Sequence, residues 1–233
     1  MSLPFTVIDL THTLSPTIAT WDSDCGFAHE LIADYNTTET DVKFRVQKIN
    51  MHAGIGTHID APAHCFAGAA SIADLDINQL IAPCIVIDVS DKSHEKYRVS
   101  PEDIISFEGC YGIIPPKSFV IIRTGWDRYF GHPEKYRNNL LFPCVSKEAA
   151  LLLLNREIVG LGIDTLSPDR VEDNNSSDLF AVHNLILGSG NYLIENIANS
   201  GSLPAIGSYS LALAMKIQDG TEAPVRLIGL IMK

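Results

Sequence analysis

Cysteine is scarce in this sequence, and its spacing argues against the usual structural uses. Five cysteines are spread over 233 residues, and no two of them form a CxxC pair. An odd, scattered set indicates neither a disulfide framework nor a structural zinc knuckle. We therefore expect free thiols, buried as small hydrophobic side chains in a reducing compartment. They are Cys25, Cys65, Cys84, Cys110 and Cys144.

Basic clusters and long apolar runs are missing as well. The 17 Lys and Arg residues are outnumbered by 28 Asp and Glu residues, which gives a formal net charge of -11. Nucleic acids and anionic membranes require a positive patch on a protein, so we expect neither as a partner. No apolar run approaches the roughly 20 residues of a membrane-spanning helix. Because no secretory leader is recognisable either, we expect a cytoplasmic protein.

The remaining composition is that of an ordinary globular protein. Hydrophobic residues make up 46% of the chain and charged residues 19%. No internal repeat, linker or low-complexity tract divides it, so we expect one domain over residues 4–233. Strand patterns outnumber helix patterns, and the predicted fold class is α/β.

Local patterns predict where the strands and helices lie. Segments rich in β-branched and apolar residues predict seven strands: Phe5–Leu10, Phe44–Met51, Cys84–Val89, Ser118–Arg123, Ile158–Ile163, Ser208–Ile217 and Val225–Met232. Ser100 before Pro101 is a helix start, since Ser caps a helix and Pro suits its first position. Ser146 can cap a second helix in the same way. The helices we expect span residues 101–107, 147–154, 71–80 and 184–198.

Three histidines form the densest group of chemically active side chains. His52, His58 and His64 lie within thirteen residues, and Asp60 lies among them. Residues i and i+2 of an extended chain point to the same side, so His58 and Asp60 share a face. Imidazole and carboxylate are the usual ligands of zinc and manganese. Pro62 turns the chain, which leaves His64 beyond the turn, where a general acid or base is suitably placed.

On spacing alone, two interpretations stay open. A histidine is commonly just a hydrogen-bonded core or surface residue, and short motifs carry false positives. The second interpretation is a metal site, because an Asp two residues after a His, with Gly54, Gly56 and Pro62 around them, is an unusual grouping.

The segment Gly56-Thr57-His58-Ile59-Asp60-Ala61-Pro62-Ala63-His64 resembles the signature of the cyclase-like metal hydrolases. This family includes bacterial kynurenine formamidases and isatin hydrolases, and its signature reads His-x-Gly-Thr-His-x-Asp-x-Pro-x-His. The resemblance extends over nearly the whole chain, through residues 8–15, 123–126, 162–167 and 223–226. It implies an α/β domain of the swivelling β/β/α type, with a mixed, partly barrel-like sheet and flanking helices.

The resemblance also implies roles for particular residues. His58 and Asp60 would be metal ligands, and His183 and Glu195 would complete the site from the other end of the chain. Asp60 and Glu195 could bridge two ions, since each carboxylate has two oxygens. His64 would be the general acid and base. Trp21 would contact the substrate, although an ordinary packed aromatic residue is an equally open interpretation.

The function implied is hydrolysis of an amide-type bond in a small substrate, in the manner of an arylformamidase. The nucleophile would be hydroxide on a zinc or manganese ion, with one or two ions per site. The family further implies a homo-oligomer, a dimer or a tetramer. Two alternatives remain: a hydrolase or dehydratase for a cyclic or non-aromatic substrate, and a relative that binds a small ligand without catalysis.

One position departs from the signature. Its first histidine falls four residues before His58, where this chain has Gly54. His52 keeps the strand parity but lies roughly 7 Å further back along an extended chain, so it needs a bulge or a bend to reach the ion. Whether His52 is a ligand, and whether the site holds one ion or two, stay open at this point.

Overall fold

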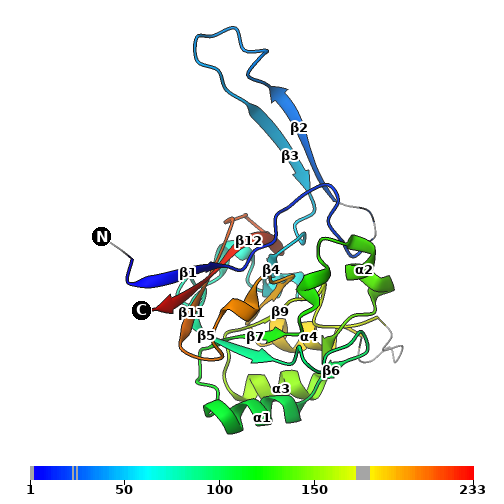
Figure 1. Ribbon diagram of the computed structural model, residues 1–233, viewed down its shortest axis with the longest axis vertical. Helices are drawn as coiled ribbons and strands as arrows, with labels where there is room; N and C mark the ends of the chain where they lie inside the picture. Colours follow the sequence, from blue (N-terminus) through cyan, green and yellow to red (C-terminus); the bar gives the residue numbers. More distant parts are fainter. Residues whose placement is uncertain (1–2, 23, 25, 172–178) are drawn as a thin grey trace.

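The centre of the structure is a mixed β-sheet that closes into a barrel. The computed structural model describes residues 3–22, 24, 26–171 and 179–233. Around the barrel, the described strands follow the order β12, β11, β5, β7, β9, β10 and β4, and β4 pairs back with β12 (Figure 1). They are β4 (His58–Asp60), β5 (Ile81–Asp88), β7 (Phe119–Arg123), β9 (Gly160–Ile163), β10 (Tyr192–Glu195), β11 (Ser208–Ala214) and β12 (Glu222–Met232). The predicted partly barrel-like α/β fold is confirmed.

The direction of the strands divides the barrel into two parts. Strands β5, β7, β9 and β10 are parallel neighbours. Every other pairing around the barrel is antiparallel. Strand β12 is long: residues 222–224 pair with β4, residues 225–231 with β11, and residues 228–232 with β1 (Phe5–Asp9). The short strand β4 is therefore held between β10 and β12.

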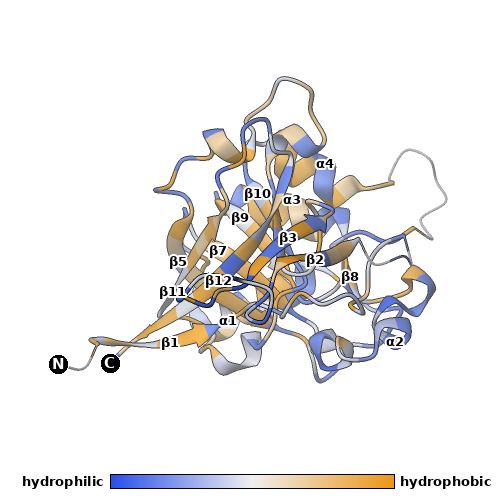
Figure 2. Cartoon of the chain, turned by 90° about the horizontal axis from the view of Figure 1, so that it is seen from above, coloured by the Kyte–Doolittle hydropathy of each residue, from blue (hydrophilic) through white to orange (hydrophobic). Residues whose placement is uncertain are grey.

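Helices α1 (Pro101–Tyr111), α3 (Lys147–Asn155) and α4 (Ala181–Gly188) pack against one face of the parallel strands. Alternate residues of β5 serve two cores. Ile85 and Ile87 pack with the helices, whereas Cys84 and Val86 pack inside the barrel. Fully burying one such aliphatic side chain stabilises the fold by about 1.5–3 kcal/mol. Strands β5 and β7 accordingly stand out as apolar in Figure 2.

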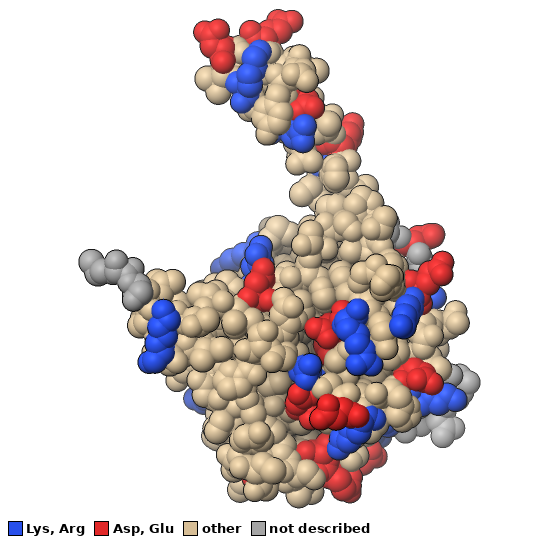
Figure 3. Space-filling view, viewed as in Figure 1, with Lys and Arg blue, Asp and Glu red and all other residues tan. Residues whose placement is uncertain are grey.

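The remaining described elements are short or lie away from the barrel. A hairpin of β2 (Phe27–Ala33) and β3 (Val46–Met51) projects from the body (Figure 1). On the face drawn in Figure 3, basic side chains lie among acidic ones and form no large patch. The short elements are β6 (Arg98–Val99), β8 (Cys144–Val145), α2 (Pro133–Arg137) and single 3-10 turns at Pro62–His64, Ile72–Asp74, Trp126–Tyr129, Asn138–Leu140 and Ser200–Ser202.

Two helix predictions were wrong. Residues 71–80 contain no α-helix and a single 3-10 turn, Ile72–Asp74, because Leu75 leaves the helical region at once with φ -57° and ψ 131°. In residues 184–198, α4 ends at Gly188, and Gly190 has a positive φ of 80° that breaks the helix. The chain then continues as β10, whose four residues are all buried between β9 and β4. Hydrogen bonding of β10 to β9 on one side and to β4 on the other stabilises the strand more than the local sequence favours a helix.

The cysteine prediction was correct in part. The four cysteines in the described residues carry reduced thiols, and Cys84 and Cys144 are buried. Cys65 and Cys110 are exposed, which corrects the expectation that all would be buried. Cys25 lies outside the described residues. A search of the described helices finds none with both the length and the apolar character needed to cross a bilayer.

Candidate metal centre

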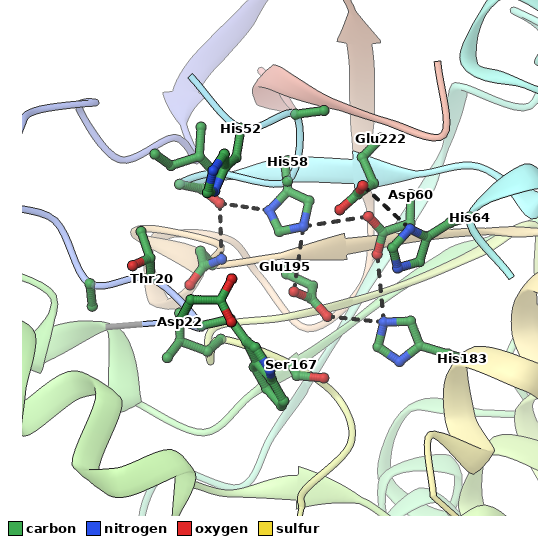
Figure 4. A pocket seen from close by; sticks show the side chains of 18 of the residues that line it. Thr20, Asp22, His52, His58, Asp60, His64, Ser167, His183, Glu195 and Glu222 are labelled. Carbon is green, nitrogen blue, oxygen red and sulfur yellow. Dashed lines mark hydrogen bonds and ion pairs between the residues drawn. The ribbon is translucent and has the colours of Figure 1, made fainter. Parts of the chain in front are cut away.

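Three neighbouring strands bring four potential ligands onto one face of the sheet. Strand β4 is antiparallel to both its neighbours, with His58 opposite Glu195 of β10 and Asp60 opposite Glu222 of β12. Directly opposite residues project to the same face, and so do residues i and i+2 of one strand. His58, Asp60, Glu195 and Glu222 therefore converge, as Figure 4 shows.

The two central carboxylates each lie between two imidazoles. His58 Nε2 is 3.4 Å from Asp60 Oδ1 and 3.5 Å from Glu195 Oε2. His183 Nε2 is 3.7 Å from Asp60 Oδ2 and 3.3 Å from Glu195 Oε1. One oxygen of each carboxylate thus faces His58 and the other faces His183. Asp60 and Glu195 thus present oxygens toward both histidines, as ligands of a divalent ion would.

His183 comes from α4, and Asp169 fixes its orientation. The Asp169 carboxylate accepts hydrogen bonds from the backbone N–H groups of Val182 and His183, each at 3.0 Å. It also lies 2.7 Å from His183 Nδ1. A proton on Nδ1 is thereby engaged by Asp169, and Nε2 is left to face Asp60 and Glu195. An outer carboxylate of this kind both orients a ligating histidine and makes it more basic.

A backbone carbonyl orients His58 instead. His58 Nδ1 is 2.9 Å from the carbonyl oxygen of Gly56, which assigns the proton to Nδ1 and leaves Nε2 to face the carboxylates. Gly56 has φ +60°, and a Cβ there would overlap Leu14, so glycine is required at this turn. The same carbonyl accepts a hydrogen bond from Asn196 Nδ2.

The buried charges are those of a cation site. Burial, reinforced by the neighbouring Glu195, raises the pKa of Asp60 to about 6. Burial opposes the charged form of His183, but its hydrogen bonds to Asp169 and Glu195 outweigh this and raise its pKa well above the usual value. Asp60 Oδ1 is buried and has no hydrogen-bond partner among the described residues. A divalent ion would supply both the missing positive charge and the missing partner, so the donor set fits one.

Among the described residues, two overlapping groups of ligand atoms each lie within 4.8 Å of one another. Asp60, His183 and Glu195 form the deep cluster, in which all three residues are buried. His58, Asp60 and Glu222 form the outer cluster, in which Glu222 is half-buried. Asp60 belongs to both. Either group could hold a divalent ion.

His64 lies outside both clusters, at the rim. It ends the turn that Pro62 begins, and its Nδ1 is 3.4 Å from Glu222 Oε2. The Glu222 contact raises the pKa of His64 in spite of partial burial. Its side chain is 33% exposed, compared with 6% for His58. The imidazole is thus close to the ligands and open to the pocket.

A pocket of about 380 Å³ opens onto these residues. Its walls include Trp21 and Phe180, whose ring centroids are 6.0 Å apart. His52 also lines the pocket, is exposed and belongs to neither cluster. The structure therefore brings His58, Asp60, His183 and Glu195 together, and it does not bring His52 to them.

Comparison with known proteins identifies the family. A family model described as putative cyclase matches residues 8–170. The chain belongs to this cyclase family. An isatin hydrolase from Roseibium aggregatum is 28% identical and aligns with 97% of this chain and 92% of its own length. A kynurenine formamidase from Bacillus cytotoxicus is also 28% identical, over 95% of each chain.

Solved structures agree with the sequence relatives. The crystal structure of an isatin hydrolase bound to the product analogue thioisatinate superposes with a TM-score of 0.91 at 27% identity, over 99% of this chain and 94% of that one. The predicted membership of the cyclase-like hydrolases is confirmed. The chain is thus a cyclase-family hydrolase with a candidate metal centre of His, Asp and Glu residues.

Two residues at the candidate metal centre, Glu222 and Asp169, were not predicted from the sequence. Glu222 directly precedes residues 223–226, a segment that resembles the family. Only the pairing of Glu222 with Asp60 places it at the site. Asp169 follows Ser167-Pro168 and lies two residues beyond the family-like segment 162–167. A carboxylate in a Pro-containing loop ahead of an apolar helix is a weak local signal. Its contact with His183 spans fourteen positions, which no local pattern reveals.

Proposed function

We propose that this cyclase-family hydrolase cleaves an amide-type C–N bond in a small aromatic substrate, in the manner of an arylformamidase. The observation that carries the proposal is the convergence of two imidazoles on the buried pair Asp60 and Glu195, with a third imidazole, His64, at the mouth of the pocket. Ligands, a proton carrier and a cavity of small-molecule size lie together.

The proposed ligands are His58, Asp60, His183 and Glu195. A bound zinc or manganese ion would lower the pKa of a water ligand and polarise the scissile carbonyl. The protein's part is to hold the donors in place without rearrangement. Asp169 fixes the ring of His183 and the Gly56 carbonyl fixes that of His58, so that each presents Nε2.

His64 would move the proton. A general base takes the proton of the attacking water and a general acid returns it to the leaving nitrogen, and one imidazole can do both in turn. The Glu222 carboxylate beside Nδ1 fixes one tautomer of His64 and leaves Nε2 for proton transfer. Its exposure allows exchange with substrate and water.

Trp21 and Phe180 support an aromatic substrate. Their rings lie on the pocket wall, where they can pack on a planar ring. The test is a panel of N-formylkynurenine, isatin and non-aromatic cyclic amides, each with added zinc or manganese. We expect N-formylkynurenine to be turned over fastest. Preference for a non-aromatic amide, or no turnover of any of them by metal-loaded protein, would refute the proposal.

We also propose that the chain forms a homo-oligomer. The β2–β3 hairpin stands clear of the body and exposes apolar side chains such as Leu31, Ile32 and Ile49. A long exposed apolar hairpin is an edge that a protein usually covers. Light scattering after gel filtration should show a dimer or larger, and charged substitutions at Ile32 and Ile49 should shift it toward monomer. A monomeric wild-type chain would disprove this proposal. Cytoplasmic location stays a prediction.

A further inference from the structure

The feature that the proposed ligand set does not use is the Glu222 carboxylate. Glu222 begins β12, faces Asp60 across the strand pair, and lies in the outer cluster with His58 and Asp60. Its two oxygens have different neighbours. Oε2 is 3.4 Å from His64 Nδ1 and 3.3 Å from the hydroxyl of Thr221. Oε1 points toward Gly54.

The space at Gly54 shows what Oε1 replaces. A Cβ built at position 54 would overlap Glu222 Oε1 and lie 3.3 Å from His58 Nε2. A side chain at this position would therefore project onto the outer cluster. Position 54 is also where the signature has its first histidine. Glycine leaves the position empty, and the carboxylate from β12 occupies the volume.

We propose that Glu222 is a metal ligand that replaces the imidazole expected at position 54. Together with His58 and Asp60 it completes a site for an ion next to the one held by the deep cluster. The inference rests on the proposed metal-dependent function and specifies its donor set. The outer site can then bind an ion without a histidine at position 54, and it does not require His52 as a ligand.

The exchange has a consequence for the choice of ion. The outer cluster now offers one imidazole and two carboxylates, where a histidine at position 54 would make it two imidazoles and one carboxylate. Carboxylate oxygen suits manganese, whereas imidazole suits zinc. The ratio of manganese affinity to zinc affinity should therefore be higher at the outer site of this chain than in a variant that carries histidine at position 54 in place of the carboxylate.

The experiment measures metal binding directly. Metal-free protein is titrated with Mn²⁺ and, separately, with Zn²⁺ against a chromophoric chelator, and bound metal is counted by elemental analysis after gel filtration. We expect two ions per wild-type chain. Glu222→Gln should keep the deep ion and bind the second at least about 100-fold more weakly, because removing even an outer partner of a ligand costs 10- to 100-fold. The retained ion shows that the variant is folded.

Three further variants make the comparison specific. Asp219→Asn removes an acidic charge from the loop before β12, at a position of φ +55° that Asn tolerates, and should bind both ions as the wild type does. The double variant Gly54→His with Glu222→Gly should regain the second ion with its preference moved toward zinc. Gly54→His alone should not show this shift of preference toward zinc, because the new imidazole and the Glu222 carboxylate would compete for the same volume.

The other outcomes are distinct. If Glu222→Gln binds both ions normally but turns over slowly, Glu222 only orients His64 and the inference is wrong. If it loses both ions, or if the double variant binds no better than Glu222→Gly, the inference is also wrong. If the wild-type chain itself binds no metal, the proposed function fails first.

Discussion

The deep and outer clusters share Asp60 but are built differently. In the deep cluster, the side chains of His183 and Glu195 are 7% and 8% exposed, and a carboxylate, Asp169, orients the histidine. In the outer cluster, the side chain of Glu222 is 24% exposed, and the backbone carbonyl of Gly56 orients His58. All three residues of the deep cluster are thus buried, whereas the outer cluster includes one half-buried residue, Glu222, beside Gly54. Residues of both clusters line the pocket.

This difference separates two tasks within one centre. Electrostatic attraction between an ion and its ligands is stronger where water is excluded, so the deep cluster should hold its ion more tightly. Glu222 of the outer cluster contacts His64, which suits a part in the reaction with substrate. The outer cluster is also where the chain departs from the family signature, at Gly54.

The largest effect should come from the residue that both clusters share. Asp60→Asn keeps the volume but removes the charge that faces His58 and His183. We expect both ions to be lost and turnover to fall at least about 1,000-fold, since the ions account for several kcal/mol of transition-state stabilisation. Elemental analysis and initial rates measure the two effects. Retention of one tightly bound ion would mean that the clusters are independent.

The second prediction concerns the imidazole that belongs to neither cluster. His64→Ala should leave the metal content unchanged, because the deep and outer ligand atoms do not include His64. Turnover should fall about 10²- to 10⁴-fold, the usual contribution of a positioned general acid or base. Rates measured at saturating manganese, beside a metal assay, test this. Loss of an ion would make His64 a ligand, and unchanged turnover would remove it from the mechanism.

Asp169→Asn tests the support of the deep cluster alone. The amide can still accept from the backbone N–H groups at the start of α4, but it no longer offers a charge to His183 Nδ1. Affinity for the deep ion should fall about 10- to 100-fold. Affinity for the outer ion should change little, because His58 depends on the Gly56 carbonyl. Chelator titration resolves both steps, and equal weakening of the two would contradict the separation.

The local backbone geometry around His58, Asp60 and His64 was predicted correctly from the sequence. His58 and Asp60 share a face because of strand parity, and Pro62 turns the chain before His64, as expected. Glu195 was placed near the site by resemblance although its segment was predicted as helix, so its identity did not depend on its local structure. Its true position follows from β10 pairing with β4.

The rest depended on contacts between distant residues. Glu222 pairs with Asp60 across 162 positions of sequence, and no local pattern around Thr221-Glu222-Ala223 indicates that pairing. The barrel closes through this same pairing of β12 with β4. One strand pairing therefore both closes the barrel and places the proposed ligand Glu222 beside Asp60. Hydrophobic periodicity cannot reveal such a pairing.

The smallest expected effect concerns His52, which the sequence offered as a substitute for the absent histidine. It sits on the pocket wall beside Gly26, where a Cβ would overlap its ring, and it contributes to neither cluster. His52→Ala should leave both manganese affinities within about twofold, since surface changes away from a ligand alter binding little. Any change should appear in KM, because His52 borders the space that a substrate would enter. The decisive measurement is the outer ion's dissociation constant in His52→Ala and Glu222→Gln side by side. If His52→Ala lost the outer ion and Glu222→Gln kept it, His52 would be the ligand and Glu222 would not be.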